Sequence, residues 1–209
     1  GNGTGNAHMD REAAQAKGAG ARENCGKHGI DTGIAWQLPQ GYGGDGVYFI
    51  FDMGGEKSGF LDFSITVPEK CEVLISIGEH LQDLRVRSAV GERSFTFRYY
   101  AKEGKNDFFY PFQHFGLRYL QLLVYSREGY VGHAAVREAT YPLTYQRIPV
   151  SDSLHKMIWQ TARRTLALCM HEHYEDCPWR EQSQYGMDSR IQMLCGYYAF
   201  GEYDFPKAG

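Results

Sequence analysis

The sequence predicts two unlike parts: an antiparallel β-sandwich and, after about residue 150, a set of α-helices. Apolar and polar residues alternate with a period of two in several segments between residues 47 and 125, and after residue 150 the apolar spacing becomes helical. Turn residues separate these segments, and no helical period lies between them. This order favours an antiparallel sandwich over a sheet of parallel strands joined by helices.

The N-terminal residues 1–30 are expected to be a disordered or tag-like lead-in. They are rich in Gly, Ala and Asn and contain few large apolar side chains, so burial cannot offset the entropy lost on ordering. Residues 31–46 contain Pro39 and several glycines, which predict an irregular, turn-rich lead-in to the sandwich.

The strands of the sandwich are predicted from alternating apolar residues, which give a strand one buried and one exposed face. The predicted segments are residues 61–67, 71–77, 95–99 and 117–125. The last of them is apolar on both faces, as expected for a central strand. Residues 104–107 read as a turn because Gly, Lys, Asn and Asp follow one another there. We assign residues 31–148 to this β-module.

Two helices are predicted in the remaining residues, 149–209. Ser151 or Asp152 is a suitable N-cap for a first helix over about residues 152–170. Its apolar residues fall on one face, which we expect to be buried: Leu154, Met157, Ile158, Thr161, Ala162, Thr165, Leu166 and Cys169. A second helical pattern, from Ile191 to Tyr198, ends at Gly201.

Composition excludes several classes of function. The net charge is −3 and basic residues are scattered, which disfavours a nucleic-acid partner. No apolar run approaches the roughly 18 residues that span a bilayer, so we expect no membrane segment. Five cysteines without close spacing disfavour a disulfide-stapled secreted fold. No signal segment is visible, which favours a cytoplasmic location for the residues given, although the first of them is Gly1 and not Met.

Candidate functional side chains are densest in residues 171–188, between the two predicted helices. Carboxylates, Arg180 and three aromatic rings lie close together there. Carboxylates and arginine hydrogen-bond sugar hydroxyls, rings stack on sugar faces, and a carboxylic acid can protonate a leaving oxygen. A solvated polar loop is also compatible with this composition, and the residues alone leave both interpretations open.

A metal site is the other chemistry that this segment suggests. Two cysteines and two histidines stand close together: Cys169, His171, His173 and Cys177. Their spacing fits no zinc finger, and Cys169 belongs to the apolar face of the first helix, so we expect no metal and no other cofactor. Pro178 and the neighbouring acids also disfavour Cys177 as a thiolate nucleophile.

The segment from Asp176 to Glu181, followed by Tyr185 and Asp188, resembles the signature of the α-L-rhamnosidases, glycoside hydrolase family 78. The family pattern, Asp-Cys-Pro-x-Arg-Glu-Arg-x-Gly-Trp-x-Gly-Asp, opens an (α/α)₆ barrel. The resemblance implies that Glu181 is the general acid, that Asp176, Arg180 and Asp188 bind sugar hydroxyls, and that Tyr185 is the stacking ring. Trp179, inside the motif, is expected to line the same site.

Three upstream segments resemble parts of the family's β-module and occur in the expected order: residues 51–59, 78–81 and 110–119. Four positions depart from the signature: Gln182 replaces Arg, Gln184 replaces Gly, Tyr185 replaces Trp and Met187 replaces Gly. Tyr185 keeps a face on which a sugar can stack. The departures indicate a distant subgroup and leave the sugar specificity open.

The resemblance implies a β-sandwich followed by the first helices of an incomplete barrel, in a parent protein that hydrolyses terminal α-L-rhamnosyl or related 6-deoxy sugar linkages with inversion. Because the family's general base lies late in the barrel, we expect these 209 residues to be inactive alone. Glu172 and Glu175 match no position of the pattern and are expected to be dispensable. A non-catalytic carbohydrate-binding sandwich and an interaction module without glycan affinity remain alternatives.

Overall fold

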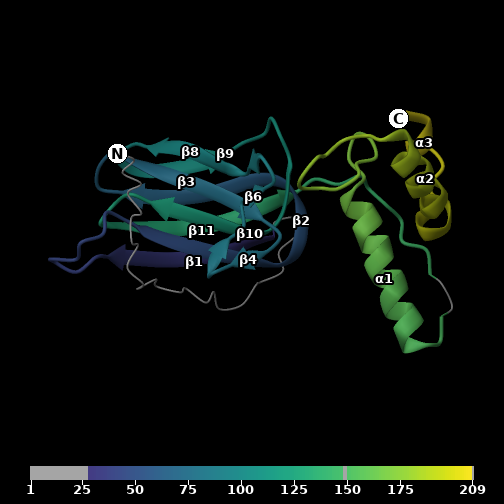
Figure 1. Ribbon diagram of the computed structural model, residues 1–209, viewed down its shortest axis with the longest axis horizontal. Coiled ribbons are helices and arrows are strands. Elements are labelled where there is room, and N and C mark those ends of the chain that lie inside the picture. Colours follow the sequence, from purple (N-terminus) through teal and green to yellow (C-terminus); the bar gives the residue numbers. More distant parts are fainter. Residues whose placement is uncertain (1–27, 148–149, 209) are drawn as a thin grey trace, which may run out of the picture.

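The computed structural model describes residues 28–147 and 150–208 and consists of a β-rich body with helices at one end (Figure 1). The long strands are β1 (His28–Gln37), β2 (Val47–Val67), β3 (Cys71–Gly78), β8 (Thr96–Ala101), β9 (Gly104–Phe109), β10 (Phe115–Val124) and β11 (Glu128–Glu138). Short strands β4 (Leu81–Gln82), β5 (Arg85–Val86), β6 (Ala89–Val90) and β7 (Arg93–Ser94) form two small hairpins. The helices are α1 (Ser153–Leu168), α2 (Gly186–Phe200) and α3 (Phe205–Ala208).

Strand β2 connects the two groups of strands in the body. Its first part pairs with β10, and its second part pairs with β11 on one side and β9 on the other, always antiparallel. The strand order is β1-β11-β2-β10-β3-β8, with β9 added on β2. Phe63, in the second part of β2, contacts Tyr99 of β8 with ring centroids 6.0 Å apart, so the two groups face each other across a core. This confirms the predicted antiparallel sandwich.

A wide bulge in β2 faces the helices. Residues 53–56 lie opposite the single residue Arg118 of β10, because the pairing shifts from Asp52–Tyr119 to Lys57–Leu117. Arg118 holds the base of the bulge with two hydrogen bonds to the Asp52 carboxylate, of 2.9 and 3.0 Å. The bulge therefore presents residues 55–58 to the helical part, where Arg164 of α1 donates a hydrogen bond to the Glu56 carbonyl.

The core of the β-module follows the alternation that predicted it. Phe63, Ile65 and Val73 are at most 1% exposed. The core also contains Trp179, which comes from the segment between α1 and α2; its ring is 7% exposed and lies 5.0 Å from Phe95. The helical part is thus anchored by an aromatic side chain that enters the sandwich.

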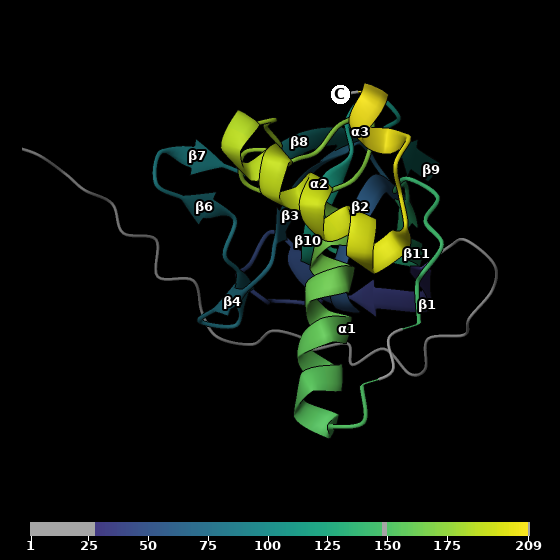
Figure 2. The ribbon, with the colours of Figure 1, turned by 90° about the vertical axis from the view of Figure 1, so that its right-hand side faces the viewer.

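The helix boundaries agree with the prediction, but the burial of the helices does not. Asp152 caps α1 by accepting a hydrogen bond from the His155 amide at 2.9 Å, and Gly201 ends α2 in the left-handed conformation. The predicted apolar face of α1 is largely exposed, with Leu154, Met157 and Ile158 each at 55–58% exposure. The N-terminal half of α1 extends away from the body (Figures 1 and 2). The expected burial of this face was therefore wrong for the residues described.

Two predicted irregular segments are strands. Residues 31–37, expected to be a turn-rich lead-in, belong to β1 and pair with β11, and residues 104–107, expected to be a turn, belong to β9. The turn lies instead at residues 102–103, between β8 and β9. The buried Asn106 side chain stabilises this turn: it accepts a hydrogen bond from the Lys102 amide and donates hydrogen bonds to the Lys102 and Gly104 carbonyls. The expected disorder of residues 1–30 concerns residues that lie almost entirely outside those described.

No helix in the described ranges is long and apolar enough to cross a membrane. The boundary that we predicted near residue 148 stays a prediction.

The burial of Trp179 leads to a stability prediction. Trp179→Ala should reduce the free energy of unfolding by about 3–5 kcal/mol, because it leaves a large cavity in the sandwich core. Trp179→Phe should cost less. The matched control is Tyr198→Ala, which removes a ring that is 76% exposed and should be nearly neutral in this chain. Urea denaturation measures the difference; equal stability of the two alanine variants would contradict the core assignment.

Candidate active site

The segment between α1 and α2 folds back on itself just before Asp176. Met170 and Tyr174, both buried, form an antiparallel bridge. The Glu175 amide then donates a hydrogen bond of 2.9 Å to the Cys169 carbonyl at the end of α1. This reversal directs the Glu175 side chain into the junction between the helices and the β-module, and it brings the following residues against the start of β10.

Glu175 is a buried carboxylate held between two histidines. Its side chain is 1% exposed; Oε1 lies 2.9 Å from His114 Nε2, and Oε2 lies 3.2 Å from His171 Nδ1. The two imidazole rings are stacked with centroids 4.1 Å apart. The other nitrogen of His171 shares a hydrogen bond of 2.8 Å with the buried Ser58 hydroxyl of β2. A buried charge requires such partners, because its desolvation is otherwise strongly unfavourable.

The contacts of Glu175 with His114 and His171 shift the pKa of its carboxyl group. Burial alone would raise the pKa of the Glu175 carboxyl, but the contacts and charges of both histidines outweigh burial and lower this pKa to about 2. In return, pairing with Glu175 raises the pKa of His114 against the effect of burial. The nitrogen and oxygen atoms are close but lack the angles of linear hydrogen bonds, so we treat these contacts as ion pairs.

The same three side chains are the candidate metal ligands of the described part of the chain, since their ligand atoms lie within 4.8 Å of one another. A metal ion bound to an imidazole nitrogen lies near the plane of the ring. Here the ring planes of His114 and His171 are stacked and only 25° apart, so their nitrogens do not converge on one ion. The arrangement suits a carboxylate between two imidazoles better than a metal. Cys169 does not add a ligand readily, because burial raises the pKa of its thiol to about 12.

Glu181 lies on the exposed side of the same segment. Its side chain is 24% exposed, and Oε2 accepts a hydrogen bond of 2.7 Å from the Tyr185 hydroxyl. The Arg180 guanidinium lies 3.5 Å from Oε1. The hydrogen bond and charge of Glu181 raise the pKa of Tyr185, and Asp176 contributes to this shift. Four of the predicted site residues, Asp176, Arg180, Glu181 and Tyr185, are therefore neighbours.

The other two predicted site residues are placed differently. Trp179 is in the sandwich core, so its ring has no face free for a sugar. Asp188 lies exposed in the first turn of α2, and within the described residues no hydrogen bond or ion pair links it to Glu181. Asp176 is held by Ser183, whose amide donates a hydrogen bond of 2.9 Å to Asp176 Oδ1.

Residues 44–139 match the family model described as the bacterial α-L-rhamnosidase concanavalin-like domain. The crystal structure of a glycoside hydrolase family 78 rhamnosidase of Bacillus sp. GL1 superposes on 80% of this chain with a TM-score of 0.68 and 30% sequence identity. Residues 44–139 therefore form a domain of the α-L-rhamnosidase family, and the two matches support a divergent, partial member of that family. The chain spans 18% of the length of the Bacillus protein.

A second solved structure supports the fold. The rhamnosidase from Klebsiella oxytoca with rhamnose bound superposes on 82% of this chain, with a TM-score of 0.67 and 21% identity, and the chain spans 35% of that protein. No curated protein sequence matches this chain.

Within this member of the family, the residues that the sequence failed to single out are Glu175, His114 and Ser58. The expectation that Glu175 is dispensable is contradicted by its complete burial between two histidines. The family pattern begins at Asp176, one residue later, and gave no signal for Glu175. The nearest sequence signal was that His114 and His171 lie on either side of residue 150, where the strand pattern changes to a helical one. The pairing of His114 with Glu175 is set by the tertiary fold.

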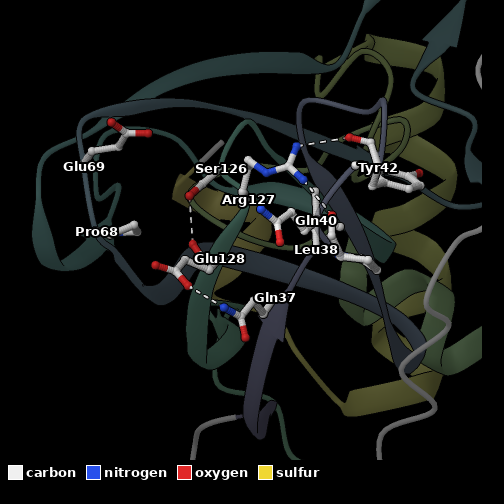
Figure 3. Close-up of a pocket in the computed structure, with 11 residues that line it drawn as sticks. Gln37, Leu38, Gln40, Tyr42, Pro68, Glu69, Ser126, Arg127 and Glu128 are labelled. Carbon is white, nitrogen blue, oxygen red and sulfur yellow. Dashed lines mark hydrogen bonds between the residues drawn. The ribbon is translucent and has the colours of Figure 1, made fainter.

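A hollow of about 950 Å³ lies beside the loop that follows β1 (Figure 3). The end of β1 lies at the end of the β-module opposite to the helices (Figure 1). Several polar groups of the hollow are paired with one another. Arg127 donates hydrogen bonds to the carbonyls of Pro39, Tyr42 and Gly44. Gln37 donates to the Glu128 carboxylate at 3.2 Å. We interpret these contacts as the anchor of the loop between β1 and β2, and they give no specific support to a carbohydrate-binding function of the β-module alone.

Glu56, in the bulge of β2, is a second carboxyl group at the junction and is partly buried. Burial first, and the charge of Glu79 second, raise the pKa of Glu56 to about 8, although Arg164 opposes the shift. Its Oε1 atom is buried without a hydrogen-bond partner. The side chain is therefore protonated at neutral pH, unlike Glu175.

The Glu175 ion pairs predict a bell-shaped dependence of stability on pH. The lowered pKa of Glu175 contributes stability above its ordinary value of 4.5, and this is lost as the pH falls toward about 2. The raised pKa of His114 contributes stability below its ordinary value of 6.5, and this is lost as the pH rises through the raised value. Glu175→Ala should cost about 3–5 kcal/mol between these limits. Glu172→Ala, at an exposed site, is the control and should cost little.

Thermal unfolding followed from pH 3 to pH 9 measures this dependence. Glu175→Gln should flatten the acid limb and remove the part of the alkaline limb that His114 contributes, since it removes the charge that couples the two groups. The comparison is made in a Glu56→Gln background, where the alkaline fall due to Glu56 is absent; an unchanged alkaline limb after Glu175→Gln in that background would show that the limb has another origin.

Glu56 predicts a separate alkaline loss of stability. Between its ordinary pKa of 4.5 and its folded-state pKa of about 8, the folded chain holds a proton that the unfolded chain releases, so stability falls as the pH rises. Glu56→Gln should remove this fall and unfold at a higher temperature than the unmodified chain at pH 8. Glu79→Gln, which removes only the repulsion, should give a smaller change in the same direction. A Glu56→Gln chain that is less stable at pH 8 would rule out a buried, protonated Glu56.

Proposed function

We propose that the protein to which this chain belongs is an inverting glycoside hydrolase that cleaves terminal α-L-rhamnosyl or related 6-deoxy sugar linkages, with Glu181 as the general acid. The observation that supports the proposal most directly is the contact between the partly exposed Glu181 carboxyl and the Tyr185 hydroxyl, 2.7 Å long, beside Arg180. A carboxyl group so placed can reach a leaving oxygen from the solvent side.

Each neighbour of Glu181 has a proposed role. Asp176 and Arg180 bind sugar hydroxyls, and Tyr185, which is 47% exposed, offers a ring face for the sugar. Asp188 is proposed as a further hydroxyl ligand from the start of α2. Trp179 is left out of the substrate contacts because its ring belongs to the core. Inversion requires a second carboxyl group about 6.5–9.5 Å from the acid, with room for a water molecule between them.

We propose that this second carboxyl group, the general base, comes from further helices of an (α/α)₆ barrel. Exposed apolar side chains on both long helices support this proposal. On α1 they are Leu154, Met157 and Ile158, and on α2 they are Met187, Ile191, Leu194 and Tyr198. Contiguous exposed apolar surface of this kind is typical of an interface with another element.

The general-acid role is tested by Glu181→Gln in the full-length protein. The variant keeps the size of the side chain but cannot donate the proton. Hydrolysis of rhamnosides with poor leaving groups should fall by about 10²–10⁴-fold, whereas activated aryl rhamnosides, which leave without protonation, should be largely spared. The ratio of kcat values for the two substrate types is the measurement.

Asp176→Asn and Arg180→Ala are the comparison variants. Both should raise KM for the two substrate types alike, because these residues are proposed to bind hydroxyls and not the leaving oxygen. If Glu181→Gln instead lowers kcat equally for both leaving groups and lowers the Tm, Glu181 only braces the loop through Arg180 and Tyr185, and the acid assignment fails.

A further inference from the structure

The loop that carries Glu181 is attached to one residue of the β-module at both of its ends. At the beginning of the loop, the Glu175 carboxylate pairs with the His114 ring at 2.9 Å. At its end, the Gln182 side-chain amide donates a hydrogen bond of 3.1 Å to the His114 carbonyl and one of 2.8 Å to the Pro178 carbonyl. Glu181 is the residue next to this second attachment.

The backbone beside Glu181 has a conformation that needs support from its surroundings. Gln182 has a φ of +53°, in the left-handed region that residues other than glycine rarely adopt. Such conformations persist where the surrounding contacts fix them, and they concentrate at functional sites. The two hydrogen bonds of the Gln182 amide are the contacts that fix this one.

The loop also packs directly on the backbone of β10. A Cβ atom placed on Gly116 would lie 2.2 Å from the Pro178 carbonyl oxygen, closer than any real contact. Pro178 is the residue whose carbonyl accepts from Gln182. The absence of a side chain at residue 116 therefore lets the loop reach His114.

We propose that His114 of the β-module, together with Gln182, is a positioning residue that sets the place of the Glu181 carboxyl. This inference rests on the proposed role of Glu181 as the general acid. It makes the β-module a part of the catalytic apparatus, because the acid is held by a residue that precedes β10 by sequence and lies outside the helical part.

The position of the acid matters because proton transfer to the leaving oxygen requires hydrogen-bond distance in the substrate complex. A displacement of about 1 Å can reduce the rate by about 10²-fold. Loss of either attachment would release one end of the loop, and the effect on activity should fall on the step that needs the proton. Loss of the His114 ring should also lower stability, because it leaves the buried Glu175 with one partner, whereas loss of the Gln182 side chain leaves this ion pair intact.

The test uses three variants of the full-length protein beside Glu181→Gln. His114→Ala removes the first attachment. Gln182→Gly removes the second while suiting the left-handed backbone, so it should not lower stability through strain. His133→Ala is the matched control, because it removes another histidine–carboxylate pair of the same module, His133 Nε2 with Asp62 Oδ1 at 2.7 Å. All variants are assayed with a poor and an activated leaving group.

His114→Ala and Gln182→Gly should reduce kcat for the poor leaving group by about 10–100-fold and affect the activated substrate much less. His133→Ala should leave the ratio of the two kcat values unchanged. If Glu181→Gln shows the leaving-group dependence and the other two variants do not, the positioning proposal is wrong while the proposed function stands.

Hydrogen exchange of the peptide covering residues 176–183 gives a readout that does not depend on any substrate. The amides of Glu181 and Ser183 donate to Cys177 Sγ and Asp176 Oδ1 in the folded loop. Their exchange should become faster in His114→Ala and Gln182→Gly but not in His133→Ala. Unchanged exchange in the first two variants overturns the proposal, whatever the activity assays show.

Discussion

The junction between the two parts of this chain depends on one buried negative charge. Glu175 cannot stay ionised in the interior without partners, and its partners come from both sides: His114 from the β-module and His171 from the segment that follows α1. Ser58 fixes the outer nitrogen of His171, so the network is completed by the bulged strand β2. Together with the Trp179 ring in the sandwich core, the pairing of Glu175 therefore holds the helices against the sandwich, and with them the segment that carries Glu181.

Two carboxyl groups at this junction differ in charge: Glu175 is ionised and Glu56 is protonated. Glu175 has two histidines within contact distance, whereas Glu56 has a buried oxygen without a partner and another carboxylate nearby. Burial alone raises the pKa of both, and only the partners of Glu175 reverse the effect. Local charge, and not depth of burial, distinguishes them.

The parts that could be predicted from the sequence are those encoded locally. The alternation in residues 61–67 and 71–77 gave two strands, and the spacing from Leu154 to Cys169 gave α1, because each signal lies within one element. Strand β1 was missed because its edge position needs little apolar alternation. The exposure of Leu154 and the burial of Trp179 were missed because they depend on which elements meet. The four gathered site residues came from a motif, whereas the contacts of Glu175 come from tertiary structure.

The glycine at residue 116 has a consequence for how such proteins can be recombined. Because a side chain there would collide with the Pro178 carbonyl, the first residues of β10 and the loop after α1 fit each other as a matched pair. A chimera that joins the β-module of one relative to the helices of another must therefore inherit both surfaces from the same parent. The two parts are separate in sequence, but the surfaces that join them, at Gly116 and Pro178, have to change together.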